Sequence, residues 1–70
     1  MRIKYDASAN AAMIYFVKET KFGMVKRETR IDLNRAGAMV NLGFDEEGKM
    51  VAIEVLHARE VLPTDALNES

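Results

Sequence analysis

Hydrophobic and polar residues alternate along much of this 70-residue chain, a pattern typical of β-strands with one buried face. The alternation is clearest in residues 38–44 and 49–56, on either side of a polar stretch at residues 45–48. Asp45 can accept hydrogen bonds from the backbone ahead of it, and Gly48 can adopt the positive φ that closes a tight turn. The pattern therefore predicts a β-hairpin around which the rest of the chain is organised.

The residues that flank the turn predict a register for this hairpin. A four-residue loop brings Phe44 opposite Lys49 and, two residues further on, Leu42 opposite Val51. This pairing collects aliphatic residues of both strands on one face. A three-residue loop with a glycine bulge would instead set Glu54 among the aliphatic residues, so the sequence favours the four-residue loop.

The second face of the hairpin is only half polar, and we expect it to be covered, either by a helix or by a second chain. Its apolar members are Met39, Met50, Ala52 and Leu56. Gly43 and Ala52 are neighbours on this face and form a low spot, where a helix or a second chain can approach the backbone closely.

Three further strands are predicted before the hairpin. Residues 2–5 alternate, residues 11–18 carry a continuous bulky run, and residues 24–33 alternate with one charged face. Helix is the alternative for residues 7–17, because four alanines favour it, although the bulky run favours strand.

The spacing of apolar residues changes after the hairpin, where residues 57–62 predict a short helix that ends at Pro63. Residues 64–67 can form one more helical turn. The expected fold is α+β and mostly β: an antiparallel meander sheet of four to five strands with a short C-terminal helix. One domain is expected over residues 1–63, followed by a tail at 64–70.

Composition narrows the possibilities for stability and location. The chain is 49% hydrophobic and 30% charged, so it should fold, but a domain of this size buries little surface. It has no cysteine, which excludes disulfides, and only one histidine, so most zinc sites are excluded as well. Self-association is then the remaining source of added stability for a domain of this size. No apolar run approaches the roughly 20 residues that span a bilayer, and no signal peptide is evident, so we expect a cytoplasmic protein without membrane contact.

One stretch of the sequence carries a family resemblance. Residues 41–56 read N-L-G-F-D-E-E-G-K-M-V-A-I-E-V-L, and they are accompanied by Tyr5-Asp6 at the end of the first strand and by Ala58, Leu62 and Pro63. With these motifs the chain resembles, over roughly residues 1–63, the YuzE-like family of small bacterial and archaeal proteins of unknown function. The resemblance implies no established activity, but it suggests a role as an antitoxin-like partner of a small toxin.

The chain departs from the family pattern at several positions. Asn10 and Gly43 stand where the family usually has aspartate, Met13 replaces a tyrosine, and Ala52 replaces a glycine. Two carboxylates are therefore missing, and an acidic site at these positions is not expected here.

Two residues offer candidate chemistry. His57 follows Glu54 by three residues, so a general base oriented by a carboxylate is conceivable. The structural alternatives are stronger: His57 would make a local hydrogen bond at the start of the helix, and Glu54 would pair across strands with Arg27 or Arg30.

The remaining charged groups fit solvated surfaces. The acidic turn at 45–47 lacks the alternating ligands of a calcium loop. The basic middle of the chain comprises Lys18, Lys21, Lys26, Arg27, Arg30 and Arg35. Because Phe22 is the only aromatic residue among them, nucleic-acid binding is not expected.

The sequence thus favours a small, non-enzymatic protein-interaction module that self-associates as a homodimer, through an edge strand or the half-apolar face of the hairpin. No catalytic, cofactor-binding or metal-binding residue is assigned, and no cofactor is expected. The alternatives are an antitoxin-like partner of a small toxin, and a small ligand-binding protein or enzyme that uses Glu54 and His57.

Overall fold

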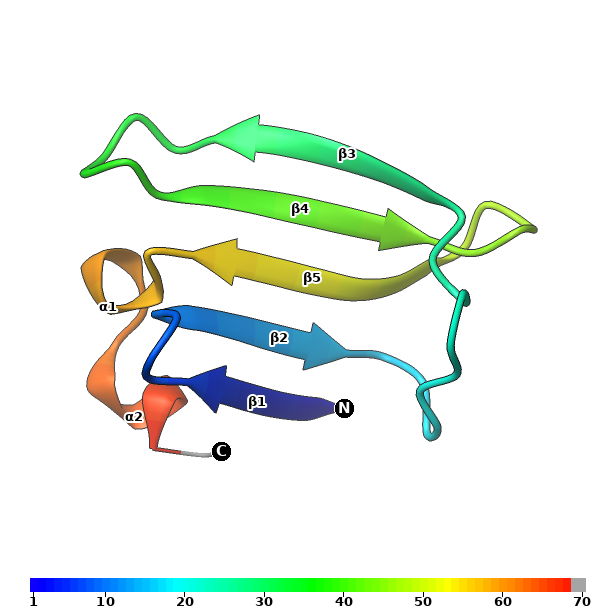
Figure 1. Ribbon diagram of the computed structural model, residues 1–70, viewed down its shortest axis with the longest axis horizontal. Coiled ribbons are helices and arrows are strands. Elements are labelled where there is room, and N and C mark those ends of the chain that lie inside the picture. Colours follow the sequence, from blue (N-terminus) through cyan, green and yellow to red (C-terminus); the bar gives the residue numbers. More distant parts are fainter. Residues whose placement is uncertain (69–70) are drawn as a thin grey trace.

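A computed structural model of the chain describes residues 1–68 and shows one open, five-stranded antiparallel sheet with two short C-terminal helices (Figure 1). The elements are β1 (Arg2–Asp6), β2 (Ala11–Tyr15), β3 (Arg27–Asp32), β4 (Met39–Phe44), β5 (Met50–Leu56), α1 (Ala58–Val61) and α2 (Thr64–Leu67). The predicted α+β, mostly β class is confirmed. Strand rather than helix at β2 is confirmed as well.

The strand order differs from a meander at one connection. The order is β1-β2-β5-β4-β3, so β5 lies between β2 and β4, and residues 16–26 carry the chain past the end of the sheet to its far edge (Figure 1). Three strand spacings of about 4.8 Å separate β2 from β3, a distance that this connection spans easily. The burial of the strands gives the reason: β5 has buried residues on both faces, whereas every residue of β3 is exposed.

The turn of the β4–β5 hairpin lies where the sequence predicted it, but its loop is shorter. The Asp45 N–H donates to the Lys49 carbonyl at 2.8 Å, and the Asp45 carboxylate accepts from the Lys49 N–H at 2.9 Å. Asp45 is therefore part of the closing pair, and only residues 46–48 form the loop. The predicted four-residue loop was wrong. It assigned the Asp45 side chain to the turn, whereas this side chain also accepts a hydrogen bond from the Lys49 N–H and so pairs Asp45 with Lys49.

A bulge beside Phe44 shifts the register by one further residue. Leu42 consequently faces Ile53 instead of Val51, and Val40 faces Val55. Because the loop and the bulge each displace the pairing by one residue, the total shift is two. A shift of two preserves the faces, so the predicted grouping of aliphatic residues survives although the individual partners changed.

The chain itself covers the low spot on the half-apolar face of the hairpin, although Met50 on that face stays 41% exposed. Gly43 pairs directly with Ala52, and a β-carbon added at Gly43 would lie 3.2 Å from both methyl groups of Val25. Val25 belongs to the connection between β2 and β3. The low spot that the sequence predicted is therefore filled by this connection, and it is no open docking place for a second chain.

The helices cover only one end of the opposite face. Buried Ala12, Val55 and Ala58 form the centre of this small core. Half-buried residues packed around them are Tyr5, Val40, Ile53, Val61, Leu62 and Leu67. Leu67 lies in α2, within the segment predicted as a tail, while residues 69–70 lie outside the described part. Among residues 1–68, no large side chain is fully buried.

Candidate interaction surface

Glu54 belongs to a polar row that crosses three strands. The register aligns Arg30 of β3, Asn41 of β4 and Glu54 of β5. The Asn41 amide donates to Glu54 Oε1 at 3.0 Å, and Arg30 Nε donates to Asn41 Oδ1 at 3.4 Å. Asn41 is 8% exposed and has a partner on both sides. The predicted direct pair between Glu54 and an arginine is thus replaced by a relay through Asn41.

His57 directly follows the last residue of β5 and has a strained backbone conformation. Its φ is 57° and ψ is 49°, in the left-handed region, and it makes no side-chain cap to α1. Its imidazole packs over Gly37, where a β-carbon would lie 3.6 Å from Nε2. The two side chains therefore have different partners. Glu54 accepts a hydrogen bond from Asn41, whereas the His57 imidazole packs against Gly37 in the β3–β4 turn.

The cap of α1 comes from a residue far away in the sequence. Asn10 Oδ1 accepts from the Arg59 N–H at 2.9 Å, and the Asn10 carbonyl accepts from the Ala58 N–H at 2.9 Å. The Tyr5 hydroxyl donates to the same Asn10 oxygen at 3.4 Å. The left-handed backbone of Asn10, with a φ of 52°, aims these groups at the helix. Their role was not predicted, because nothing local links residues 10 and 59.

The turn between β1 and β2 is closed by Asp6. The Ser8 hydroxyl donates to Asp6 Oδ1 at 2.7 Å, and the Ser8 and Ala9 N–H groups donate to the same oxygen. The hydrogen bond from the Ser8 hydroxyl, followed by that from the Ala9 N–H, lowers the pKa of the exposed Asp6 carboxyl. This aspartate is therefore engaged in local structure.

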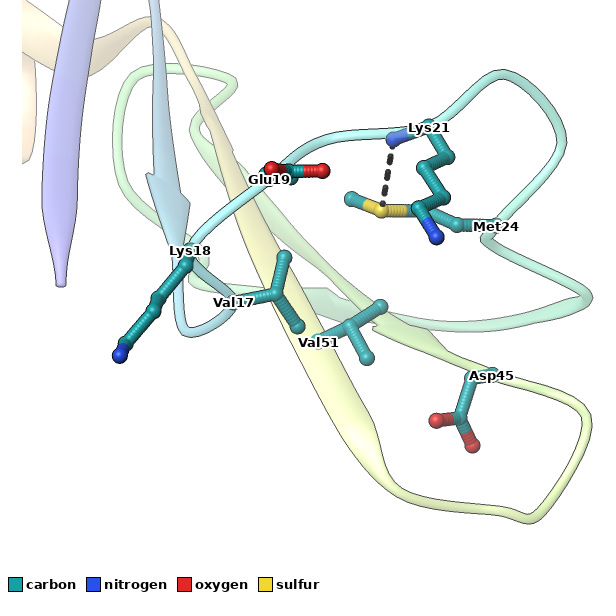
Figure 2. Close-up of a pocket in the computed structure, with 7 residues that line it drawn as sticks. All are labelled: Val17, Lys18, Glu19, Lys21, Met24, Asp45 and Val51. Carbon is teal, nitrogen blue, oxygen red and sulfur yellow. Dashed lines mark hydrogen bonds between the residues drawn. The ribbon is translucent and has the colours of Figure 1, made fainter.

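A shallow hollow lies beside the β2–β3 connection (Figure 2). Its volume is about 460 Å³, and its apolar lining consists of Val17, Met24 and Val51. The Lys21 N–H donates to the Met24 sulfur at 3.5 Å, a hydrogen bond within the connection itself. A second hollow, of about 570 Å³, has Glu54 in its wall, but His57 does not line it. Neither hollow unites the two residues that the sequence singled out.

Three arginines in the middle of the chain, including Arg30 described above, contact other groups of the protein at separate places. The Arg27 guanidinium lies 5.3 Å from the centre of the Phe44 ring, and Arg35 Nε donates to the Glu60 carbonyl at 3.2 Å. Among residues 1–68, no three histidine, cysteine or acidic side chains gather as metal ligands. In the same residues, no helix has the length and apolarity that crossing a bilayer requires.

The outer edge of β3 is the longest open edge of the sheet. All six residues from Arg27 to Asp32 are exposed, and within residues 1–68 β4 is their only neighbouring strand. The other edge strand, β1, is shorter and has α2 beside it (Figure 1). Unpaired backbone groups on an open edge are a ready template for another strand. Edge β3 is therefore the part of the sheet most available to a partner.

Comparison with known proteins adds a family. Residues 2–59 match the family described as "Protein of unknown function (DUF2283)". The chain belongs to the DUF2283 family. The DUF2283 match covers the whole sheet and ends within α1, so α2 lies beyond it. No curated protein and no solved structure matches the chain. The narrower resemblance to YuzE-like proteins and the antitoxin-like role stay predictions.

The surface of this DUF2283 chain is large for its mass. A folded monomer of 7.9 kDa is expected to expose about 4,400 Å². The chain exposes 5076 Å². Ile31 and Leu33 contribute apolar surface at the β3 end of the sheet, where they are 43% and 39% exposed. The ribbons of the two helices lie beside β5, β2 and β1 and not beside β3 (Figure 1). Arg35, in the turn after β3, still donates to the Glu60 carbonyl of α1.

Proposed function

We propose that this DUF2283 protein is a small, non-enzymatic protein-interaction module that self-associates as a homodimer. We also propose, on the sequence grounds given above, that it works in the cytoplasm. The observation that carries the proposal is the surface excess of about 650 Å² over a typical monomer of this mass. A standard protein interface buries about 800 Å² on each partner. The excess in total surface is smaller than this value but of the same order.

The weak core supports the same conclusion. A chain of 70 residues buries only about 60% of the surface that its unfolded form exposes, and such domains often need a further source of stability. No cysteine supplies a disulfide. Ile31 and Leu33 remain accessible on the face that holds the core. Burial of these side chains against a second copy would add apolar contact where the single chain has least.

The contacts of the titratable residues favour binding over catalysis. The Glu54 carboxylate accepts from Asn41, the Asp6 carboxylate accepts from Ser8 and Ala9, and His57 packs on Gly37. Each group has its own structural contacts. A general acid or base would need to share one concave site with a second reactive group.

Sedimentation equilibrium of the purified chain over a wide concentration range tests the proposal. We expect the mass to rise with concentration from 7.9 kDa to twice that value. A mass that stays at 7.9 kDa at every concentration would contradict self-association.

A further inference from the structure

We infer that the homodimer forms by antiparallel pairing of β3 with β3 of a second copy, in the register that places the two Thr29 residues opposite each other on a two-fold axis. This inference rests on the self-association proposed above and specifies its surface. The result would be one continuous ten-stranded sheet. The two-fold axis would pass through the middle of the open edge.

The backbone of β3 presents the groups that such pairing needs. In an antiparallel ladder, alternate residues bond the neighbouring strand and the residues between them point away. The Leu33 N–H donates to the Ala38 carbonyl, and the register continues with Ile31 opposite Val40. The N–H and C=O groups of Thr29 and Ile31 therefore face β4. Those of Glu28 and Arg30 face the open edge.

The charges along the edge are complementary to themselves about Thr29. Lys26, Glu28, Arg30 and Asp32 alternate in sign, positive then negative, on either side of this residue. A two-fold axis at Thr29 sets each Glu28 opposite Arg30 of the second copy, and each Lys26 opposite Asp32. Four pairs of opposite charge result. Glu28 and Arg30 are also residues whose backbone groups face the partner, so this register forms the backbone hydrogen bonds as well, and the charges distinguish it from its neighbours.

Neighbouring registers lose this complementarity. An axis at Arg30 sets that residue against itself and Glu28 against Asp32. An axis at Glu28 sets Glu28 against itself and Lys26 against Arg30. Both arrangements oppose like charges, which destabilises a strand pair. An axis at Ile31 sets Arg30 opposite Asp32, which gives only two pairs of opposite charge instead of four.

The other face of the new ladder gains apolar contact. The axis at Thr29 sets Ile31 opposite Arg27 of the second copy. The Arg27 guanidinium lies over the Phe44 ring, so the stem of Arg27 is held flat on this face. Ile31, which is 43% exposed in the single chain, would pack on that stem. The pairing thus covers part of the apolar surface at the β3 end of the sheet.

Charge reversal with mixing tests the register. Glu28→Arg and Arg30→Glu each set like charges opposite one another, and we expect each variant alone to dimerise at least tenfold more weakly than the natural chain. An equimolar mixture of the two variants restores opposite charges at both pairs, so the mixture should form a heterodimer. Glu46→Arg and Lys4→Glu change the net charge equally at exposed positions away from the edge, and they should leave dimerisation unchanged.

Cysteine crosslinking tests the same register without altering charge, since the chain has no cysteine of its own. A residue pair that does not share hydrogen bonds has Cα atoms about 4.5 Å apart, within the range of a disulfide. Thr29→Cys should therefore form a covalent dimer under mild oxidation. Ile31→Cys lies on the same face, but its two copies would be about 13 Å apart along the strands, so it should form no covalent dimer under the same conditions.

The outcomes separate this inference from the proposed function. A natural chain that remains monomeric overturns self-association. A natural chain that dimerises while Thr29→Cys fails to crosslink, or while both charge variants dimerise normally, overturns the β3 interface and leaves self-association intact. Circular dichroism of each variant shows whether it is folded. If one charge variant is unfolded, the two cysteine variants still decide the register.

Discussion

Replacement of Asn41 tests whether Glu54 is held in place for the fold or is available for a ligand. Asn41→Leu removes the donor that lies 3.0 Å from Glu54 Oε1 and keeps a side chain of similar size in a central strand. A hydrogen bond to a charged group contributes about 1.5–3 kcal/mol. Because Glu54 is only half-buried, water replaces part of this loss, and we expect the lower end, about 1.5 kcal/mol.

This loss is large for a domain of this size. The free energy of unfolding of a 70-residue domain is expected to be about 4–10 kcal/mol. A loss of 1.5 kcal/mol should lower the melting temperature by about 6–12 °C. Urea denaturation followed by circular dichroism measures the change. Every variant must be compared at one protein concentration, since self-association adds to apparent stability.

A double-mutant cycle gives the sharpest form of the test. Glu54→Leu alone leaves the buried Asn41 amide without its acceptor and should cost about 1 kcal/mol. The double variant replaces both partners with apolar groups and should be close to the natural chain in stability. The interaction free energy should therefore exceed about 1 kcal/mol. Additive single losses, or a Glu54→Leu chain more stable than the natural one, would refute the structural role of Glu54.

Three further changes test local features. Gly43→Ala should lower the free energy of unfolding by about 1 kcal/mol, because its new methyl lies 3.2 Å from Val25. In a Val25→Ala background the same change should raise it by about 0.5 kcal/mol, as measured by urea denaturation. An equal effect in both backgrounds would show that the two residues do not touch. Ser8→Ala should raise the pKa of Asp6 toward its ordinary value in an NMR titration, and an unchanged pKa would contradict the hydrogen bond. Since the folded pKa of Asp6 is lowered, its stabilisation is present above the unfolded value of about 3.9 and is lost as pH falls through the folded pKa. His57→Gly should be more stable than His57→Ala by about 1 kcal/mol, because residue 57 has a φ of 57°, and equal stabilities would argue against strain there.

The sequence predicted the elements of the fold better than their connections. Period-two alternation located four strands, and the continuous bulky run located β2. The charged face of residues 24–33 indicated exposure on one side, but the expected meander placed this strand inside the sheet rather than at its edge. The position of β5 between β2 and β4 depends on which strands bury both faces, a property that emerges only when the whole sheet is assembled. The apolar run of β5 was the available signal for a central strand.

The hairpin shows where turn chemistry alone is insufficient. Asp45 and Gly48 correctly located the turn, yet the same Asp45 side chain bonds Lys49 and shortens the loop. The compensating bulge beside Phe44 has no local sequence signature. Alternation predicted which residues share a face of the sheet, because a shift of two residues leaves each side chain on the same face. It could not predict which residues of β4 and β5 lie opposite each other.

The surface was partly predictable for a similar reason. The alternating charges around Thr29 are visible in the sequence, but their meaning depends on β3 being an outer strand with Glu28 and Arg30 facing the open edge. The cap that Asn10 supplies to α1 was hidden because it joins residues 49 positions apart. Long-range contacts of this kind require the assembled fold.

Amide hydrogen exchange of the unmodified chain tests the central claim most directly. In a single chain, the N–H groups of Glu28 and Arg30 point to solvent and exchange rapidly, whereas those of Thr29 and Ile31 are bonded to β4. We predict that the Glu28 and Arg30 amides are protected as well, and that their protection increases with protein concentration. Rapid exchange of these two amides at high concentration, beside protected Thr29 and Ile31, would contradict the pairing of β3 with a second copy.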